Sequence, residues 1–298
     1  KLAQKLKPVN VIISIEHKFN NIVISLYNKN DQKNKEFIDS VKFFNPIISN
    51  PSNDENGENE ETEEEKEETA SKSSIRERQV HEVILGGDRI YGKNGHERVT
   101  GSAGFWVLDN SNQSYLLTAG HGARVLSNRS RTVKFYSSSN TIIGPMHYYH
   151  SNITDFGLIS YENPEIIPVP RIRNYEAALY PEIFIEDVLF MNTEGSHVCK
   201  SGEKTGTTCG ELAAIDGVST NSKGFILYGI LKMRLFAAGG DSGGSVFHYV
   251  DLSHRYSFPY AYAVGILVRS NVIRGTSIVV PANVIMQYGI RFMEGVYF

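Results

Sequence analysis

Hydrophobic residues in this chain fall into short runs bounded by Gly, Asn, Ser or Asp, a pattern typical of strands separated by turns. From about Ile84 these runs follow one another closely, at 104–108, 115–118, 156–161, 225–231, 245–249, 261–268 and 277–280. Many short strands with turn residues between them predict an all-β barrel or sandwich. One helix is expected near the end, opened by Pro281, anchored by Ile285 and Tyr288, and capped by Gly289.

The first fifty residues have a different pattern. Two apolar runs, 11–15 and 22–26, are separated by polar residues and predict a β-hairpin. The segment 31–44 is expected to be helical because apolar residues recur in it at helical spacing, namely Phe37, Ile38, Val41 and Phe44. A hairpin and one helix bury too little surface to be stable alone, so residues 1–50 are expected to pack against another part of the protein.

Charge is unevenly distributed along the chain. Residues 51–70 contain ten acidic residues and one lysine, a local balance of −9. Such a segment cannot collapse against its own charge, and we expect a disordered linker over residues 51–83. The rest carries about +6, since 29 basic residues face 23 acidic ones, which gives no case for a nucleic-acid partner. No run of eighteen apolar residues exists, so no membrane span is expected.

The two cysteines, Cys199 and Cys209, are too few for a zinc site, which takes four ligands. They are either buried free thiols or a disulfide that closes a small loop and contributes about 2–3 kcal/mol. A disulfide would require an oxidising compartment. Sequons at Asn112, Asn128 and Asn152 also favour a secreted glycoprotein.

A glycine-rich run around Ser242, Gly-Gly-Asp-Ser-Gly-Gly, is the strongest chemical signal. Paired glycines suit a tight loop whose N–H groups point at a developing negative charge. Upstream, Thr-Ala-Gly precedes His121, and Asp155 precedes a predicted strand. Serine, histidine and aspartate in this arrangement can perform nucleophilic catalysis, because the imidazole activates an otherwise inert hydroxyl.

Residues 84–298 resemble the streptogrisin and α-lytic branch of the chymotrypsin-like serine proteases. The resemblance extends over six segments, which are 84–88 with 90–91, 102–105, 117–121, 154–159, 199–210 and 240–244. It implies two six-stranded antiparallel β-barrels with a short C-terminal helix, and a disulfide between Cys199 and Cys209. It also implies a secreted, monomeric serine endopeptidase that cleaves protein or peptide substrates and needs no cofactor or metal.

The resemblance assigns roles to the three candidate residues. Ser242 would be the nucleophile, His121 the general base, and Asp155 the residue that orients the imidazole. Asp155 is preferred by its order in the chain and by the strand that follows it, although other aspartates exist, namely Asp88, Asp109 and Asp216. The amides of Gly240 and Ser242 would form the oxyanion hole.

Two further assignments follow from the resemblance. Asp241 is expected to pair with Lys200 and thereby shape the oxyanion loop; the alternative is a solvated lysine. The substrate groove is expected to be lined by Val268, Arg269, Ser270 and Thr276. Val268 stands where the family usually has a serine that supports the aspartate. Arg269 could face an acidic substrate side chain or point outward into water, and the outward orientation is favoured.

The chain departs from the family in its other disulfides. The family usually has a cysteine directly after the histidine, where this chain has Gly122, and its partner near Gly101 is also missing. A cysteine shortly before the serine is replaced by Phe236. These losses affect the expected thermal stability more than the chemistry.

The resemblance also suggests a precursor organisation. Residues 1–50 would be part of a pro-segment and residues 84–298 the protease domain, with cleavage near Val83 and Ile84. The pro-segment would template the folding of a slow, non-local β fold and mask the active site. Residues 1–50 could instead be an independent interaction module, and the whole chain a catalytically silent homologue that serves as a binding module.

Overall fold

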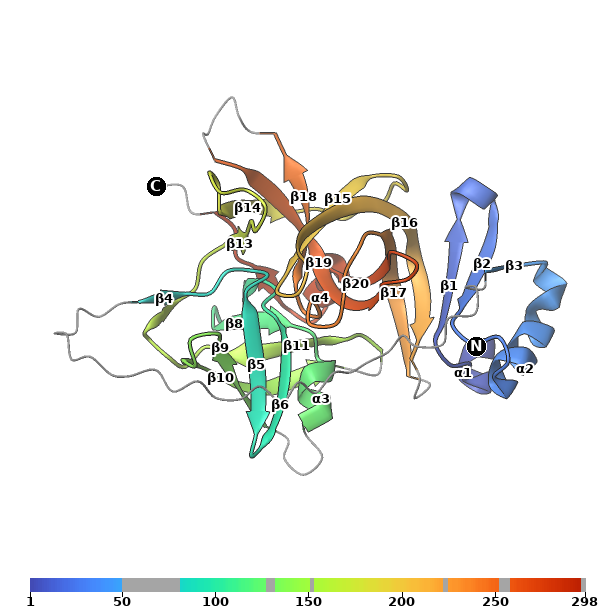
Figure 1. Cartoon of the computed structure of the whole chain (residues 1–298), viewed down its shortest axis with the longest axis horizontal. Helices are drawn as coiled ribbons and strands as arrows, with labels where there is room; N and C mark the ends of the chain where they lie inside the picture. Colours follow the sequence, from blue (N-terminus) through green and yellow to red (C-terminus); the bar gives the residue numbers. More distant parts are fainter. Residues whose placement is uncertain (50–80, 127–131, 151–152, 222–224, 252–257, 296–298) are drawn as a thin grey trace.

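The computed structural model describes residues 1–49, 81–126, 132–150, 153–221, 225–251 and 258–295. Two β-barrels pack against each other, and the first 49 residues lie outside them, beside the second barrel (Figure 1). The predicted all-β architecture is confirmed. Two of the three sequons, at Asn128 and Asn152, lie outside the described residues, whereas Asn112 is exposed in a turn.

The first barrel begins with β5 (Arg89–Asn94) and follows the strand order β7-β8-β11-β10-β9-β5-β6. Only residues 103–105 separate β6 from β7, so the two ends of this order are halves of one bent strand, and the sheet closes. The C-terminal β21 (Arg291–Phe292) pairs with β7. The other strands are β6 (Glu97–Ser102), β7 (Trp106–Leu108), β8 (Ser114–Thr118), β9 (Val133–Ser137), β10 (Ile142–His150) and β11 (Phe156–Ser160).

The second barrel closes as a ring of six antiparallel strands in the order β15-β16-β17-β20-β19-β18. These strands are β15 (His197–Gly202), β16 (Gly206–Thr220), β17 (Ile226–Arg234), β18 (Ser245–Val250), β19 (Tyr260–Asn271) and β20 (Thr276–Pro281). Outside the ring, β14 (Glu182–Val188) pairs with β19, and β13 (Arg171–Arg173) pairs with β14. The predicted last helix is α4 (Ala282–Met286), with Pro281 as its N-cap and Ile285 buried.

Residues 1–49, the N-terminal module, contain the predicted hairpin and helix. The module comprises α1 (Leu2–Leu6), β1 (Val11–Glu16), β2 (Asn21–Leu26), α2 (Gln32–Val41) and β3 (Ile47–Ser49), with 3₁₀ turns at His17–Phe19 and Lys42–Phe44. Asp31 caps α2 by accepting hydrogen bonds from the Lys33 and Asn34 amides. Phe37 and Val41 are buried, as the helical spacing predicts, but Phe44 is 54% exposed.

The predicted linker and the predicted helix content need correction. Most of residues 51–83 lies outside the described residues, but β4 (Glu82–Val83) is a strand that pairs in parallel with β12 (Ile166–Ile167). The ordered second part of the chain therefore begins upstream of Ile84. The helix α3 (His121–Leu126) was also not predicted, because its first residue, His121, was interpreted as the last residue of the 117–121 motif.

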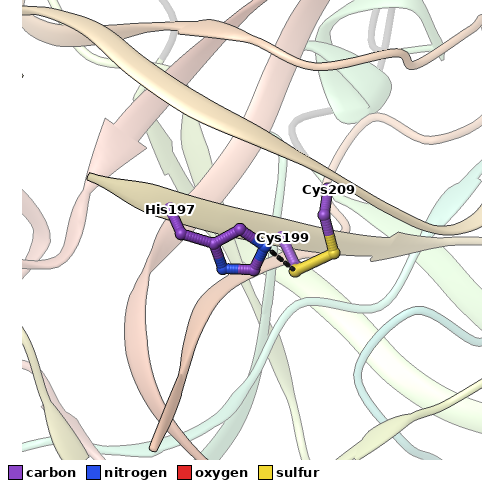
Figure 2. A group of neighbouring side chains, drawn as sticks. All are labelled: His197, Cys199 and Cys209. Carbon is purple, nitrogen blue, oxygen red and sulfur yellow. Dashed lines mark hydrogen bonds between the residues drawn. A yellow bond between two sulfur atoms is a disulfide. The ribbon is translucent and has the colours of Figure 1, made fainter. Parts of the chain in front are cut away.

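Cys199 and Cys209 form a disulfide, which excludes the alternative of two free thiols (Figure 2). The two residues lie directly opposite each other in the antiparallel pair β15–β16. The bond therefore closes the hairpin formed by these strands. Cys199 is fully buried.

We predict that replacing both cysteines by alanine lowers the free energy of unfolding by about 2–3 kcal/mol, because the open hairpin gains conformational entropy when the chain unfolds. Urea unfolding of the variant and of the parent protein tests this. Adding reductant should destabilise the parent by a similar amount and leave the variant unchanged. Equal stability of the two oxidised proteins would contradict the prediction.

Candidate active site

His121 and Asp155 lie together because of how β8 pairs with β11. The register places Thr118 opposite Gly157, so the residues just after β8 and just before β11 are neighbours. The His121 Nδ1 atom lies 2.7 Å from Asp155 Oδ2, and the His121 amide donates to Asp155 Oδ1 at 2.8 Å. Both carboxylate oxygens therefore bind one residue, which fixes the orientation of the imidazole. With Nδ1–H donated to the carboxylate, Nε2 is left for a second partner.

Asp88 and Asp109, two of the other candidate aspartates, have partners elsewhere. Asp88 forms an ion pair with Arg173 at 2.8 Å, and Asp109 accepts hydrogen bonds within its own turn. Asp216 has a positive φ of 51° in the middle of β16. Asp155 is therefore the aspartate that pairs with His121.

Asp155 is buried and still ionised. Burial raises the pKa of its carboxyl group, but the charge and hydrogen bonds of His121 and the charge of Arg269 outweigh this effect, so the pKa lies below its usual value. An ionised carboxylate accepts the imidazole N–H and would stabilise an imidazolium.

The turn that carries Ser242 packs between the two barrels. The Ser242 carbonyl accepts a hydrogen bond from the Ser102 amide at 2.8 Å, and the Gly243 amide donates to the Leu267 carbonyl at 2.7 Å. A side chain on Gly243 would collide with the Thr118 hydroxyl and the Ser102 carbonyl, and the φ of +91° at Gly243 also favours glycine. Thr118 is three residues before His121, so the serine turn and the histidine lie at the same place between the barrels.

The amides of the turn divide into two groups. Those of Asp241, Gly243 and Gly244 donate to backbone carbonyls. Within the described part of the chain, the amides of Gly240 and Ser242 have no hydrogen-bond acceptor. Two unpaired amides beside a serine are the arrangement that an oxyanion hole requires.

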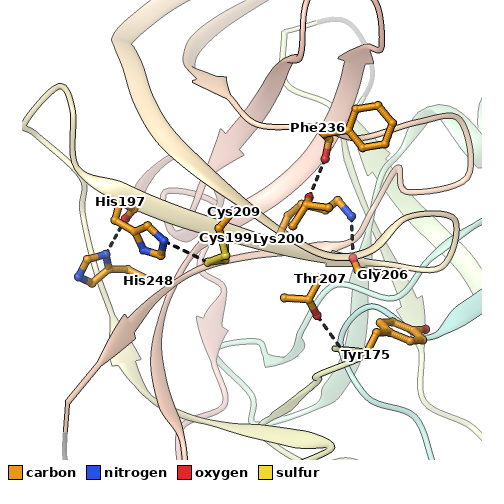
Figure 3. The surroundings of a disulfide bond; sticks show 10 residues. Tyr175, His197, Cys199, Lys200, Gly206, Thr207, Cys209, Phe236 and His248 are labelled. Carbon is orange, nitrogen blue, oxygen red and sulfur yellow. Dashed lines mark hydrogen bonds between the residues drawn. A yellow bond between two sulfur atoms is a disulfide. The ribbon is translucent and has the colours of Figure 1, made fainter. Parts of the chain in front are cut away.

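Asp241 and Lys200 form the predicted ion pair, and both side chains are fully buried. The Lys200 Nζ atom lies 3.5 Å from Asp241 Oδ2 and donates to the Thr205 hydroxyl at 2.6 Å. It also donates to the Gly206 carbonyl at 2.6 Å (Figure 3). Thr205 in turn donates to Asp241 from its hydroxyl and its amide. Burial lowers the pKa of the Lys200 ammonium, although the Asp241 charge acts in the opposite direction. The alternative of a solvated lysine is excluded.

The chain is similar in sequence to known proteins. The chain is 32% identical over 164 residues to Serine protease 1 of Streptomyces fradiae, an alignment that covers 55% of this chain and 42% of that protein. It is 28% identical over 165 residues to Streptogrisin-D of Streptomyces griseus, covering 55% and 38%. The chain thus spans less than half the length of these two relatives. No family model matches it.

Among solved structures, Thermobifida fusca Protease A superposes with a TM-score of 0.55 at 21% identity, over 72% of this chain and 100% of that one. This likeness establishes the chymotrypsin-like double-barrel fold. The chain is similar in sequence to streptogrisin-type serine proteases.

The predicted groove residues lie on β19 and β20, but two side chains differ from expectation. Val268 is 1% exposed and packs in the core, so its side chain cannot contact a substrate. Arg269 does not point outward into water; it is half-buried and donates to the Ser219 hydroxyl at 3.1 Å. Ser270 and Thr276 are half-buried, next to the turn that joins the two strands.

One cluster among the described residues has the residue types of a metal site. His197, Cys199 and Cys209 lie close together, and His197 Nε2 is 3.8 Å from the Cys199 sulfur (Figure 2). Both sulfurs are bonded to each other, so neither thiolate is available to a metal ion. His248 binds the His197 carbonyl through Nδ1 at 2.7 Å. The cluster therefore consists of a disulfide and the histidine beside it.

Asp155 should contribute stability that depends on pH. Because its pKa is lowered by folding, its contribution is fully present above its unfolded pKa of about 4 and is lost as pH falls through the folded value. In a Ser242→Ala background, adding Asp155→Asn should lower the free energy of unfolding most above about pH 4. The difference in the free energy of unfolding between the proteins with and without Asp155→Asn should become smaller at lower pH. A difference that stays constant from about pH 5 to pH 2 would contradict this.

Lys200→Met should destabilise the protein by about 3–5 kcal/mol, because it leaves Asp241 buried without a counter-charge. The double variant Lys200→Met, Asp241→Asn should recover part of the loss. Lys134→Met, at an exposed position, serves as the control and should stay within about 0.5 kcal/mol of the parent. Urea unfolding measures all three, and equal stability of Lys200→Met and the control would contradict the importance of the buried pair.

Proposed function

We propose that this chain is a serine endopeptidase, made as a precursor, that hydrolyses peptide bonds through an acyl-enzyme with Ser242, His121 and Asp155. The observation that carries the proposal is the His121–Asp155 hydrogen bond of 2.7 Å beside the packed turn of Ser242. The similarity to Serine protease 1 and Streptogrisin-D supports it.

The first step forms the acyl-enzyme. The Ser242 hydroxyl attacks the substrate carbonyl while its proton passes to His121 Nε2, and Asp155 stabilises the resulting imidazolium. The carbonyl oxygen becomes an alkoxide and accepts hydrogen bonds from the Gly240 and Ser242 amides. When the intermediate collapses, the C–N bond breaks and His121 gives its proton to the leaving amine. A water molecule then attacks the ester by the same route and releases Ser242.

The buried Asp241–Lys200 pair supports the oxyanion loop in this account. Asp241 accepts hydrogen bonds from Ala238, Lys204 and Thr205 amides at 2.9–3.0 Å, so its carboxylate connects the serine turn to the loop 203–205. The pair thus fixes the backbone of the serine turn both before and after Gly240. Preorganised donors do not have to reorient as the alkoxide forms.

We further propose that the protein is secreted and that residues 1–49 belong to a pro-segment. The Cys199–Cys209 disulfide supports an oxidising compartment. The structure has no helix, among the described residues, that is long and apolar enough to cross a membrane. The protein would need no cofactor and would act on protein or peptide substrates.

A fluorophosphonate probe tests the proposed function. We expect the probe to label the wild-type protein, either as the full chain or after cleavage within residues 51–80, and to leave Ser242→Ala unlabelled. His121→Ala should slow labelling by several orders of magnitude, because the hydroxyl loses its base. Ser245→Ala, which removes a buried hydroxyl bound to the Gly104 carbonyl, serves as the control.

Labelling of the Ser242→Ala variant would show that another residue reacts with the probe. A folded wild-type protein that stays unlabelled both before and after cleavage would instead support the alternative that this is a catalytically silent homologue.

A further inference from the structure

The backbone around the expected cleavage point is hydrogen-bonded on both sides. The Glu82 amide donates to the Glu165 carbonyl at 2.7 Å, and β4 then pairs in parallel with β12. On the other side of the bond, the Ile84 carbonyl accepts a hydrogen bond from the Trp106 indole at 2.9 Å. The segments before and after the Val83–Ile84 bond are therefore each bound to another part of the fold.

The residues that follow this bond contact both barrels. The Gly86 amide donates to the Arg171 carbonyl at 2.9 Å, and the Gly86 carbonyl accepts from the Arg173 amide at 2.8 Å. Both partners lie on β13, which belongs to the sheet of the second barrel. The Gly87 amide donates to the Ala103 carbonyl at 2.7 Å, in the bent strand of the first barrel. This stretch of backbone cannot move away from one barrel without losing hydrogen bonds to the other.

The side chains at the expected cleavage point are also held in place. Ile84 is 2% exposed and packs in the core of the first barrel, and Leu85 is 1% exposed. The Glu82 carboxylate accepts a hydrogen bond from the Ser139 hydroxyl at 2.7 Å. Among residues 82–85, Val83 alone has an exposed side chain. A protease that cut between Val83 and Ile84 would have to pull two buried aliphatic side chains out of the interior.

Such a segment is a poor substrate. Proteases cut folded proteins at exposed loop tips, or at segments that unfold locally, because the cleaved chain must enter the active site in extended form. The opened segment would lose its strand pairing with β12, its hydrogen bonds and its buried apolar surface. The rate of cleavage would then be limited by the small population of the opened form.

The serine turn does not require the group that this cut would create. Cleavage before Ile84 would produce a new ammonium group. Asp241, the buried carboxylate of the serine turn, already has Lys200 as its counter-charge, and Asp88 is paired with Arg173 at 2.8 Å. The contacts that hold the candidate site are thus made while the chain is continuous through this bond.

We propose that the Val83–Ile84 bond stays intact in the active protease and that β4 is a permanent strand of the protease domain. The inference rests on the proposed function, because it concerns the form of the chain that is active. It differs from the cleavage point that the family resemblance implies. Any processing that separates residues 1–49 would leave Glu82 and Val83 on the protease domain.

Accessibility of the bond is tested by limited proteolysis of the full-length Ser242→Ala protein, which lacks the proposed nucleophile. Elastase is a suitable probe because its small specificity pocket accepts an aliphatic residue such as valine. The matched control is a free peptide of residues 78–89, in which the same bond has no folded surroundings. Mass spectrometry should show that elastase cuts this bond at least a hundredfold more slowly in the folded protein than in the peptide. A smaller difference would overturn the proposal.

The form of the active protein is tested through the mass of the polypeptide that a fluorophosphonate labels. We expect the labelled polypeptide to contain Glu82 and Val83. Val83→Asp, a change at an exposed side chain that makes the bond a poor substrate for an aliphatic specificity pocket, should alter labelling by less than twofold. A labelled polypeptide that begins at Ile84, or accumulation of folded but unlabelled full-length Val83→Asp, would overturn the proposal. Absence of labelling in every variant would refute the proposed function, while the elastase experiment would still decide whether the bond is accessible.

Discussion

The candidate site depends on one steric constraint, the fit of the Gly243 turn between the two barrels. The backbone there has a φ of +91°, and the Thr118 hydroxyl and the Ser102 carbonyl occupy the space of any side chain. Because Thr118 ends the strand that leads to His121, the close approach that glycine permits places the serine turn against the end of this strand. A larger residue would move the turn away from β8.

Two buried carboxylates then give the site its charge distribution. Asp155 is held by His121, and Asp241 by three amides, one hydroxyl and Lys200. Buried charges of this kind are tolerated only when they are fully hydrogen-bonded, so each fixes the backbone around it. One orients the His121 imidazole, and the other connects the turn that contains Gly240 and Ser242 to the loop 203–205.

The sequence was sufficient for the features that depend on local residue type. The sequence predicted the tight turn around Ser242, the short strands and the start of the last helix at Pro281. Each of these features depends on the residue types at that place in the chain. The orientation of Arg269 and the burial of Val268 could not be predicted, since both depend on which other strands lie near β19 in the fold. The docking of Glu16 onto Lys232 also escaped prediction, because it joins residues 216 positions apart. The strand at residues 82–83 was missed because its partner, β12, is also remote in sequence, with Glu82 paired to Ile166.

The central claim is that folding places the Ser242 hydroxyl against the imidazole that Asp155 orients, beside the Gly240 and Ser242 amides. A crystal structure of the protein after reaction with a fluorophosphonate tests it most directly. The account predicts phosphorus bonded to Ser242 Oγ, the phosphonyl oxygen accepting hydrogen bonds from the Gly240 and Ser242 amides, and His121 Nε2 within hydrogen-bonding distance of the adduct. An unmodified Ser242 with the imidazole directed elsewhere would contradict it.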